Sequence, residues 1–142
     1  MPEPDWLKRA RRKGLVVHES GSQPLPSDDL EIPEPRLLSE RQWQAIVVGY
    51  ARGRGWKVAH FRKVRVRRGN REYWETPVAA DGKGFPDLIM VRDDVLLALE
   101  LKVKNKIATE EQAAWLIAFA PVAKSARVWK PKDWLELREL LK

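Results

Sequence analysis

One carboxylate of this chain lies in an apolar segment, where a buried charge is energetically unfavourable. Glu100 interrupts the apolar run 95–101 (VLLALEL), which has the composition of a buried strand, and Lys102 follows two residues later. Burying a charge in such a place is costly unless something positive meets it. Three explanations are open: a neighbouring cation, a metal ion, or exposure at the strand end.

The spacing of these residues suggests phosphoryl chemistry. Side chains two apart on a strand leave the same face, so Glu100 and Lys102 can converge on one reagent. Asp87 starts the preceding predicted strand, and the short turn 92–94 brings it alongside. Two carboxylates can hold a divalent cation that polarises a phosphate oxygen and acidifies a water, while Lys102 positions that water or stabilises the added charge. An ordinary strand start and a salt-bridged strand end are the alternatives.

The composition limits which metal is expected. The chain has no Cys and only two His, His18 and His60, far apart in sequence. Thiolate chemistry and a histidine-rich metal centre are therefore not expected. Oxygen ligands favour Mg²⁺ or Mn²⁺.

Positive charge is concentrated in one part of the chain. The net charge is +7, yet residues 1–35 contain more acidic than basic residues. No acidic residue falls between Glu40 and Glu72, where ten basic residues lie. This distribution is typical of a protein that binds a polyanion, although a solubilising face is the alternative. The predicted DNA contacts are Arg62, Lys63, Arg65, Arg67, Arg68 and Arg71, with Trp74 for base stacking.

The elements that must position these residues can be predicted from pattern. Ser39 and Gln42 form a capping box that starts a helix ending near Arg54, with Trp43, Ile46, Val47 and Tyr50 as its buried stripe. Residues 56–66 are predicted as one strand and 67–83 as a long polar loop. Residues 85–91 and 95–102 form an antiparallel hairpin whose second strand is central in a sheet.

The remaining segments complete an α/β pattern. A capping box at Thr109 and Gln112 starts a helix to about 120, a short strand covers 126–129, and a helix runs from 131 to 141 with Trp134, Leu137 and Leu141 on one face. The predicted order is α-β-β-β-α-β-α, an α/β sheet with helices packed on it. Trp43, Trp56, Trp115, Trp129 and Trp134 are predicted to fill the core.

Two regions divide the chain. Residues 1–35 are rich in Pro, Ser, Gly and Asp and are predicted to be a flexible arm, and residues 36–142 form the folded domain. The sequence shows neither a long apolar span nor a secretory leader, so we expect a soluble, cytoplasmic protein with no membrane partner.

The order of the motifs resembles a known family. Pro86-Asp87 followed by Glu100-x-Lys102 matches the PD-(D/E)XK nuclease superfamily. Across residues 37–135 the chain resembles its VRR-NUC (virus-type replication-repair nuclease) branch in Ser39-Glu40 with Gln44, "GWKVAHF", "GFPDLIMV", "LELK", "TEEQAAWL" and "VWKPKDW".

The resemblance implies a fold and a set of roles. It implies a restriction-endonuclease-like αβββαβ core with a mixed sheet flanked by helices, in a bacterial or phage-infected cell. The implied catalytic residues are Glu40, Asp87, Glu100, Lys102 and Gln112, with Asp87, Glu100 and the Leu101 carbonyl as metal ligands. The loop 67–83 is longer than the resemblance leads us to expect.

Gln112 has two interpretations from the sequence itself. It shares a helical face with Trp115, Leu116 and Phe119, where a polar group requires a partner. It also stands at the capping-box position of its helix, which would explain it without any role in a site.

These observations predict a metal-dependent DNA endonuclease. No recognition helix or separate specificity domain is apparent, so we expect the protein to recognise the shape and the sugar-phosphate backbone of DNA. The resemblance implies branched DNA such as a four-way (Holliday) junction as the substrate, cut by a homodimer, in replication, recombination or repair. The alternatives are a less selective nuclease or nickase and a noncatalytic DNA-binding protein on the same fold.

Overall fold

The computed structural model describes residues 37–61, 64–75 and 78–142. The predicted arm, Arg62 and Lys63 therefore lie outside the described residues. The elements follow the order α2 (Glu40–Gly53), β1 (Lys57–His60), β2 (Val64–Arg68), β3 (Arg71–Glu75), β4 (Leu88–Arg92), β5 (Val95–Leu101), α3 (Glu110–Phe119), β6 (Ser125–Trp129), the 3₁₀ turn η2 (Pro131–Asp133) and α4 (Trp134–Leu141). The α/β class predicted from the sequence is confirmed.

A mixed sheet of four strands forms the centre of the molecule. Its strand order is β1-β4-β5-β6; β1, β4 and β5 are antiparallel neighbours, and β6 runs parallel to β5. The predicted hairpin is thus β4–β5, and β5 is central as its uniformly apolar sequence indicated. The parallel partner requires a crossover, which α3 supplies.

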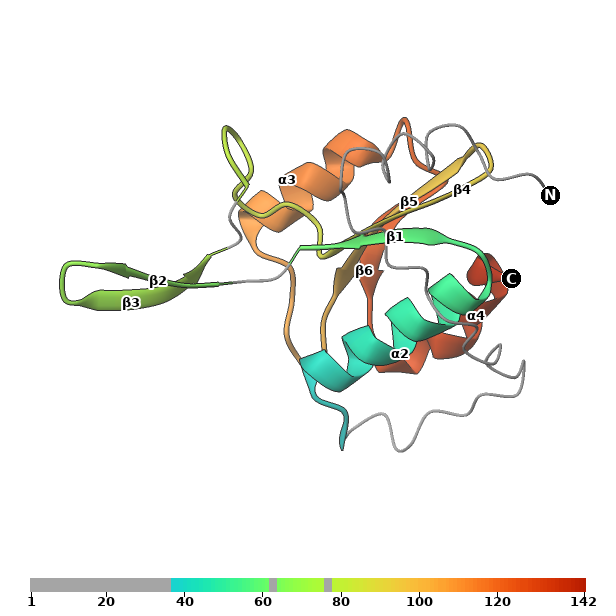
Figure 1. The fold of residues 1–142 in the computed structure, drawn as a ribbon, viewed down its shortest axis with the longest axis horizontal. Coiled ribbons are helices and arrows are strands. Elements are labelled where there is room, and N and C mark those ends of the chain that lie inside the picture. The colour runs from blue at the N-terminus through green and yellow to red at the C-terminus, as the bar shows by residue number, and fades with distance from the viewer. Residues whose placement is uncertain (1–36, 62–63, 76–77) are drawn as a thin grey trace, which may run out of the picture.

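Helices flank the sheet on both sides. Figure 1 shows α2 and α4 on one side and α3 on the other. Alternate residues of β5 point to α2 and α4, so Leu97, Leu99 and Leu101 join the main core there. The same core takes the buried stripes of both helices, namely Trp43, Val47 and Tyr50 of α2 and Trp134, Leu137 and Leu141 of α4, with Ile46 packed partly buried against it.

Both predicted capping boxes are present. Ser39 caps α2 and Thr109 caps α3, and in each case the glutamine three residues later returns a hydrogen bond to the cap backbone. Each box satisfies two main-chain donors that a helix start would otherwise leave without partners. These local interactions explain why the starts of both helices were predictable from sequence.

The predicted strand 56–66 and the predicted loop 67–83 are wrong. The strand ends at His60, and a second strand, β2, pairs with β3 in a separate two-stranded sheet. The alternation of residues in 56–66 continues across the break, so the pattern did not reveal it. Figure 1 shows this β2–β3 hairpin projecting away from the central sheet.

The tryptophans follow the prediction with one exception. Trp43, Trp56, Trp129 and Trp134 are buried. Trp115 is only half-buried; it packs with Phe85 and Phe119 and donates from its indole N–H to the Asp81 carbonyl at 3.0 Å. Within the described part of the chain, no helix has the length and apolar character needed to cross a membrane.

Candidate functional site

The β4–β5 register brings Asp87 to Glu100. Leu88 pairs with Leu99, so Asp87, immediately before β4, lies opposite Glu100. The pairing is reinforced by a side chain, since the Leu101 N–H donates to Asp87 Oδ2 at 2.9 Å. On its other side, the Asp87 carbonyl accepts from the Phe61 N–H at 3.0 Å. Asp87 is therefore held between the ends of β1 and β5.

Glu100 is completely buried on the α3 side of β5. Its exposed fraction is 0%, and Lys102, on the same face, is 6% exposed. Lys102 Nζ lies 3.5 Å from Glu100 Oε1. The same carboxylate oxygen accepts from Gln112 Nε2 at 2.8 Å. Of the three explanations open from the sequence, a neighbouring cation is present, and exposure at a strand end is excluded.

Gln112 combines the two roles that the sequence left as alternatives. Its side-chain oxygen accepts from the Thr109 N–H at 2.8 Å, which completes the capping box. Its side-chain nitrogen donates to Glu100. One amide therefore both starts α3 and ties it to β5.

The buried polar side chains of the described residues form one set. Outside the aromatic residues they are Asp87, Glu100, Lys102 and Gln112, and each was predicted as a site residue. A fold that buries two carboxyl groups and an amine at adjoining strand positions accepts a desolvation cost that apolar residues would avoid. Such clusters are typical of functional sites.

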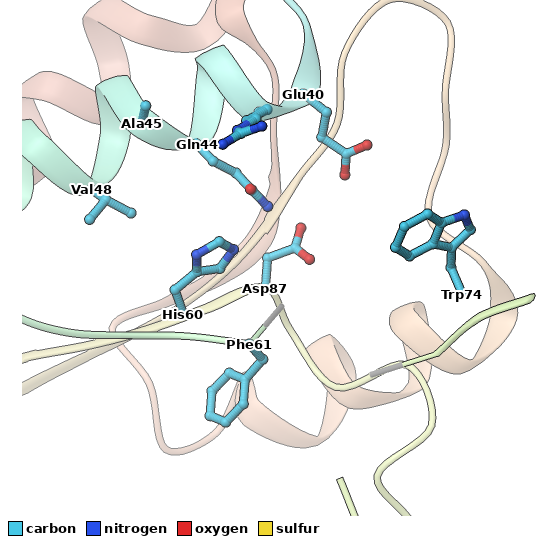
Figure 2. Close-up of a pocket in the computed structure, with 9 residues that line it drawn as sticks. Glu40, Gln44, Ala45, Val48, His60, Phe61, Trp74 and Asp87 are labelled. Carbon is cyan, nitrogen blue, oxygen red and sulfur yellow. The ribbon is translucent and has the colours of Figure 1, made fainter. Parts of the chain in front are cut away.

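A pocket of about 920 Å³ opens beside Asp87. Figure 2 shows the side chains of Glu40, from the first turn of α2, and Asp87 directed into it, with Trp74 across from them. Gln44, one helical turn after Glu40, also lines the pocket. Lys106 Nζ lies 4.0 Å from the half-buried Glu40 carboxylate. Glu40 thus joins Asp87 at the pocket, and Glu100 and Lys102 lie buried on the neighbouring strand.

The loop before Asp87 is held against the start of α3. Gly84 has φ +79°, and a Cβ there would lie 2.6 Å from the Glu111 carbonyl carbon. Lys83 bridges the exposed Glu111 at 3.1 Å. The backbone N–H of Glu111 and then Lys83 lower the pKa of the Glu111 carboxyl below its usual value. Only glycine permits this close approach, which sets Asp87 and Gln112 in place together.

Six of the residues that line the pocket were not predicted as site residues, and three of these, Gln44, Ala45 and Val48, lie on α2. Arg41, His60 and Phe61 line the pocket with Asp87. His60 and Phe61 reach the pocket because His60, on β1, pairs with Leu88, the β4 residue that follows Asp87. Strand pairing between distant segments carries no signal in a single sequence. Arg41 was noted from the sequence only as one of the ten basic residues between Glu40 and Glu72.

The predicted DNA contacts that the structure describes lie on the β2–β3 hairpin. Arg65, Arg67, Arg68 and Arg71 are exposed, and Trp74 is 64% exposed at the end of β3 that adjoins the pocket. The hairpin therefore joins the basic surface to the acidic site.

The donor set fits a magnesium-type ion only in part. Among the residues that the structure describes, no group of three or more His, Cys, Asp or Glu could hold a metal ion. Asp87, immediately before β4, and Glu100, on β5, nevertheless offer hard oxygen donors. Mg²⁺ commonly takes one or two protein carboxylates and completes its shell with water and substrate phosphate. Two carboxylates therefore suit Mg²⁺ or Mn²⁺ better than Zn²⁺.

Comparisons of the chain with protein-family models, curated proteins and solved structures found no match.

Proposed function

We propose that the protein is a divalent-metal-dependent DNA endonuclease that hydrolyses phosphodiester bonds, on a restriction-endonuclease-like core of the VRR-NUC type. The observation that carries the proposal is the burial of Asp87, Glu100, Lys102 and Gln112, with Asp87 lining an open pocket. A purely structural core gains nothing from two carboxyl groups and an amine in these positions.

In this proposal Asp87, Glu100 and the Leu101 carbonyl hold Mg²⁺ or Mn²⁺. When bound, the ion supplies Lewis-acid polarisation of the phosphate and a more acidic water. Lys102, held 3.5 Å from Glu100, stabilises negative charge that develops on the phosphate or orients the attacking water. Gln112 fixes the Glu100 carboxylate by its 2.8 Å hydrogen bond, and Glu40 adds a carboxylate at the pocket.

DNA as substrate is supported by charge. The described hairpin residues 64–75 include four arginines, all exposed, and the sequence places Arg62 and Lys63 directly before them. Clustered arginine suits phosphate recognition, because each guanidinium can make paired hydrogen bonds to phosphate oxygens. A bound DNA would then run along the hairpin toward the pocket.

The finer proposal is action on branched DNA by a homodimer. One small site cuts one strand per binding event, and two sites related by a dyad would make the paired cuts that resolve a four-way junction. Sedimentation at micromolar concentration, combined with cleavage of matched junction, flap and linear duplexes, tests this. A monomer that cuts all three equally would remove the junction-resolving role and leave the nuclease chemistry intact.

A plasmid-nicking assay tests the main proposal. Supercoiled plasmid is incubated with the protein in Mg²⁺, in Ca²⁺ and in EDTA, with Asp87→Asn as the matched control for a contaminating nuclease. Nicking in Mg²⁺ alone, and only by the wild type, is the expected result. Absence of nicking in Mg²⁺ and Mn²⁺ on plasmid, flap and junction DNA would favour the second candidate, a noncatalytic DNA-binding protein supported by the exposed basic hairpin.

A further inference from the structure

The β2–β3 hairpin has two chemically different faces. Residues directly opposite each other in an antiparallel pair share a face. Arg65 pairs with Trp74 and Arg67 with Glu72, and these four define the Trp74 face. Val66 pairs with Tyr73 and Arg68 with Arg71, and these four, together with Val64, define the Tyr73 face.

The Trp74 face is the one continuous with the pocket. Trp74 lines the pocket together with Asp87, and Figure 2 shows its indole beside that opening. The Arg65 guanidinium lies 5.5 Å from the centre of the Trp74 ring and 3.6 Å from the Glu72 carboxylate. On the Tyr73 face, Val66 and Tyr73 are half-buried. The exposed arginines that lead to the site are thus Arg65 and Arg67.

The shape and charge of the hairpin suit a groove of duplex DNA. We propose that the β2–β3 hairpin is a DNA-binding ribbon that lies in the major groove of B-form duplex with its Trp74 face inward, holding the duplex beside the pocket. The major groove, about 12 Å wide, admits a two-stranded ribbon. The minor groove of undeformed B-form duplex, about 6 Å wide, would have to widen at an energetic cost to admit the ribbon, because the two backbones alone lie about 4.8 Å apart before the arginine and tryptophan side chains are added.

Arg65 and Arg67 contact phosphates or base edges in this arrangement, and Glu72 opposes them. Glu72 is exposed, so its pairing with Arg65 is weak and a phosphate displaces it at little cost. Removing the Glu72 charge therefore strengthens binding, an effect that loss of folding cannot imitate. The inference rests on the proposed action on DNA, but it does not depend on the cleavage chemistry.

Binding is measured in EDTA by fluorescence anisotropy with a labelled linear duplex, so that no cleavage intervenes. Arg65→Ala/Arg67→Ala should weaken binding about tenfold or more and lower the slope of log affinity against log salt by about 1.8, which is about 0.9 for each phosphate that an arginine no longer neutralises. Arg68→Ala/Arg71→Ala is the matched control with the same loss of charge from the Tyr73 face, expected to weaken binding about threefold or less. Glu72→Gln should bind about threefold more tightly.

The groove that the hairpin occupies and the type of nucleic acid that it binds are tested in the same assay. Methyl green, a major-groove ligand, should displace the protein, and a minor-groove ligand such as distamycin should not. Duplex RNA of the same sequence should bind at least about tenfold more weakly, because the major groove of A-form RNA is deep and narrow. Equal losses of affinity from the two arginine pairs, displacement by distamycin alone, or equal affinity for duplex RNA would each overturn the inference.

Failure of this inference is distinguishable from failure of the proposed function. Magnesium-dependent nicking that persists in Arg65→Ala/Arg67→Ala, with unchanged affinity, would remove the ribbon and leave the nuclease. Binding that depends on Arg65 and Arg67 without any nicking would leave the ribbon and remove the nuclease. Thermal unfolding of each exposed-residue variant confirms that its fold is intact.

Discussion

Gln112 Nε2 lies 2.8 Å from Glu100 Oε1, and both side chains are buried. The bond joins the first turn of α3 to the central strand β5. The position of Glu100 is thus set by the helix start as well as by the strand, and the start of α3 in turn packs against Gly84, three residues before Asp87. Two proposed metal ligands are in this way positioned by one helix terminus.

Replacing Gln112 should damage both stability and cleavage. Gln112→Ala removes a capping acceptor and a buried donor to a carboxylate, so we expect a loss of about 2–3 kcal/mol in the free energy of unfolding. Cleavage should slow about 10–100-fold at unchanged DNA affinity, because the residue orients a ligand and does not bind DNA. Urea unfolding and single-turnover cleavage measure the two effects.

Gln42 provides the matched control. It occupies the same capping-box position in α2 and accepts from the Ser39 N–H at 2.9 Å, but it is exposed. Gln42→Ala should cost about 0.5–1 kcal/mol and leave the cleavage rate unchanged. Equal rate losses for the two variants would show that Gln112 acts only through its helix cap.

Magnesium should stabilise the fold through Asp87 and Glu100. Raising free Mg²⁺ to about 100 times its Kd should add about 2.7 kcal/mol to the free energy of unfolding. Asp87→Asn and Glu100→Gln should abolish this gain and cleavage while DNA binding survives, because each changes charge with little change of shape. Ca²⁺ should support DNA binding without turnover. Asp94→Asn, in the exposed β4–β5 turn, is the control. Undiminished magnesium stabilisation of Asp87→Asn would exclude Asp87 as a ligand.

Loss of Lys102 should affect chemistry more than binding. Lys102→Ala should slow the chemical step by about 10² or more, because the ammonium beside Glu100 stabilises charge or moves a proton during reaction. Single-turnover rates and anisotropy in Ca²⁺ separate the step from affinity. Lys104→Ala, at an exposed position two residues further on, should retain the full rate. A loss of affinity alone in Lys102→Ala would contradict the catalytic role.

Two glycines should respond oppositely to alanine. Gly84→Ala places a Cβ 2.6 Å from the Glu111 carbonyl carbon at φ +79°, so we expect a cost of about 2–4 kcal/mol and slower cleavage. Gly49, inside α2, has nothing within 4 Å of an added Cβ. Gly49→Ala should stabilise the protein by about 0.5–1 kcal/mol. Thermal and urea unfolding of both variants test this, and a neutral Gly84→Ala would remove its proposed positioning role.

The sequence alone predicted features whose causes are local. The capping boxes at Ser39 and Thr109 and the turn at 92–94 act over three or four residues, so α2, α3 and the β4–β5 hairpin could be placed. Because the hairpin register follows from its turn, the approach of Asp87 to Glu100 was predictable too. A carboxylate in an apolar strand also requires a partner wherever the strand lies.

Tertiary structure alone decided what depends on distant segments. The alternation of 56–66 fits one strand or two, and only pairing with β4 and β3 divides it after His60. The same pairings bring His60 and Trp74 to the pocket with Asp87. The two interpretations of Gln112 could not be separated beforehand, because its oxygen meets its own helix while its nitrogen meets Glu100 on a strand packed against that helix. Local hydrogen bonds and side-chain periodicity depend on neighbouring residues, so a short stretch of sequence specifies them. Contacts across the sheet depend on the packing of distant segments, which no short stretch specifies.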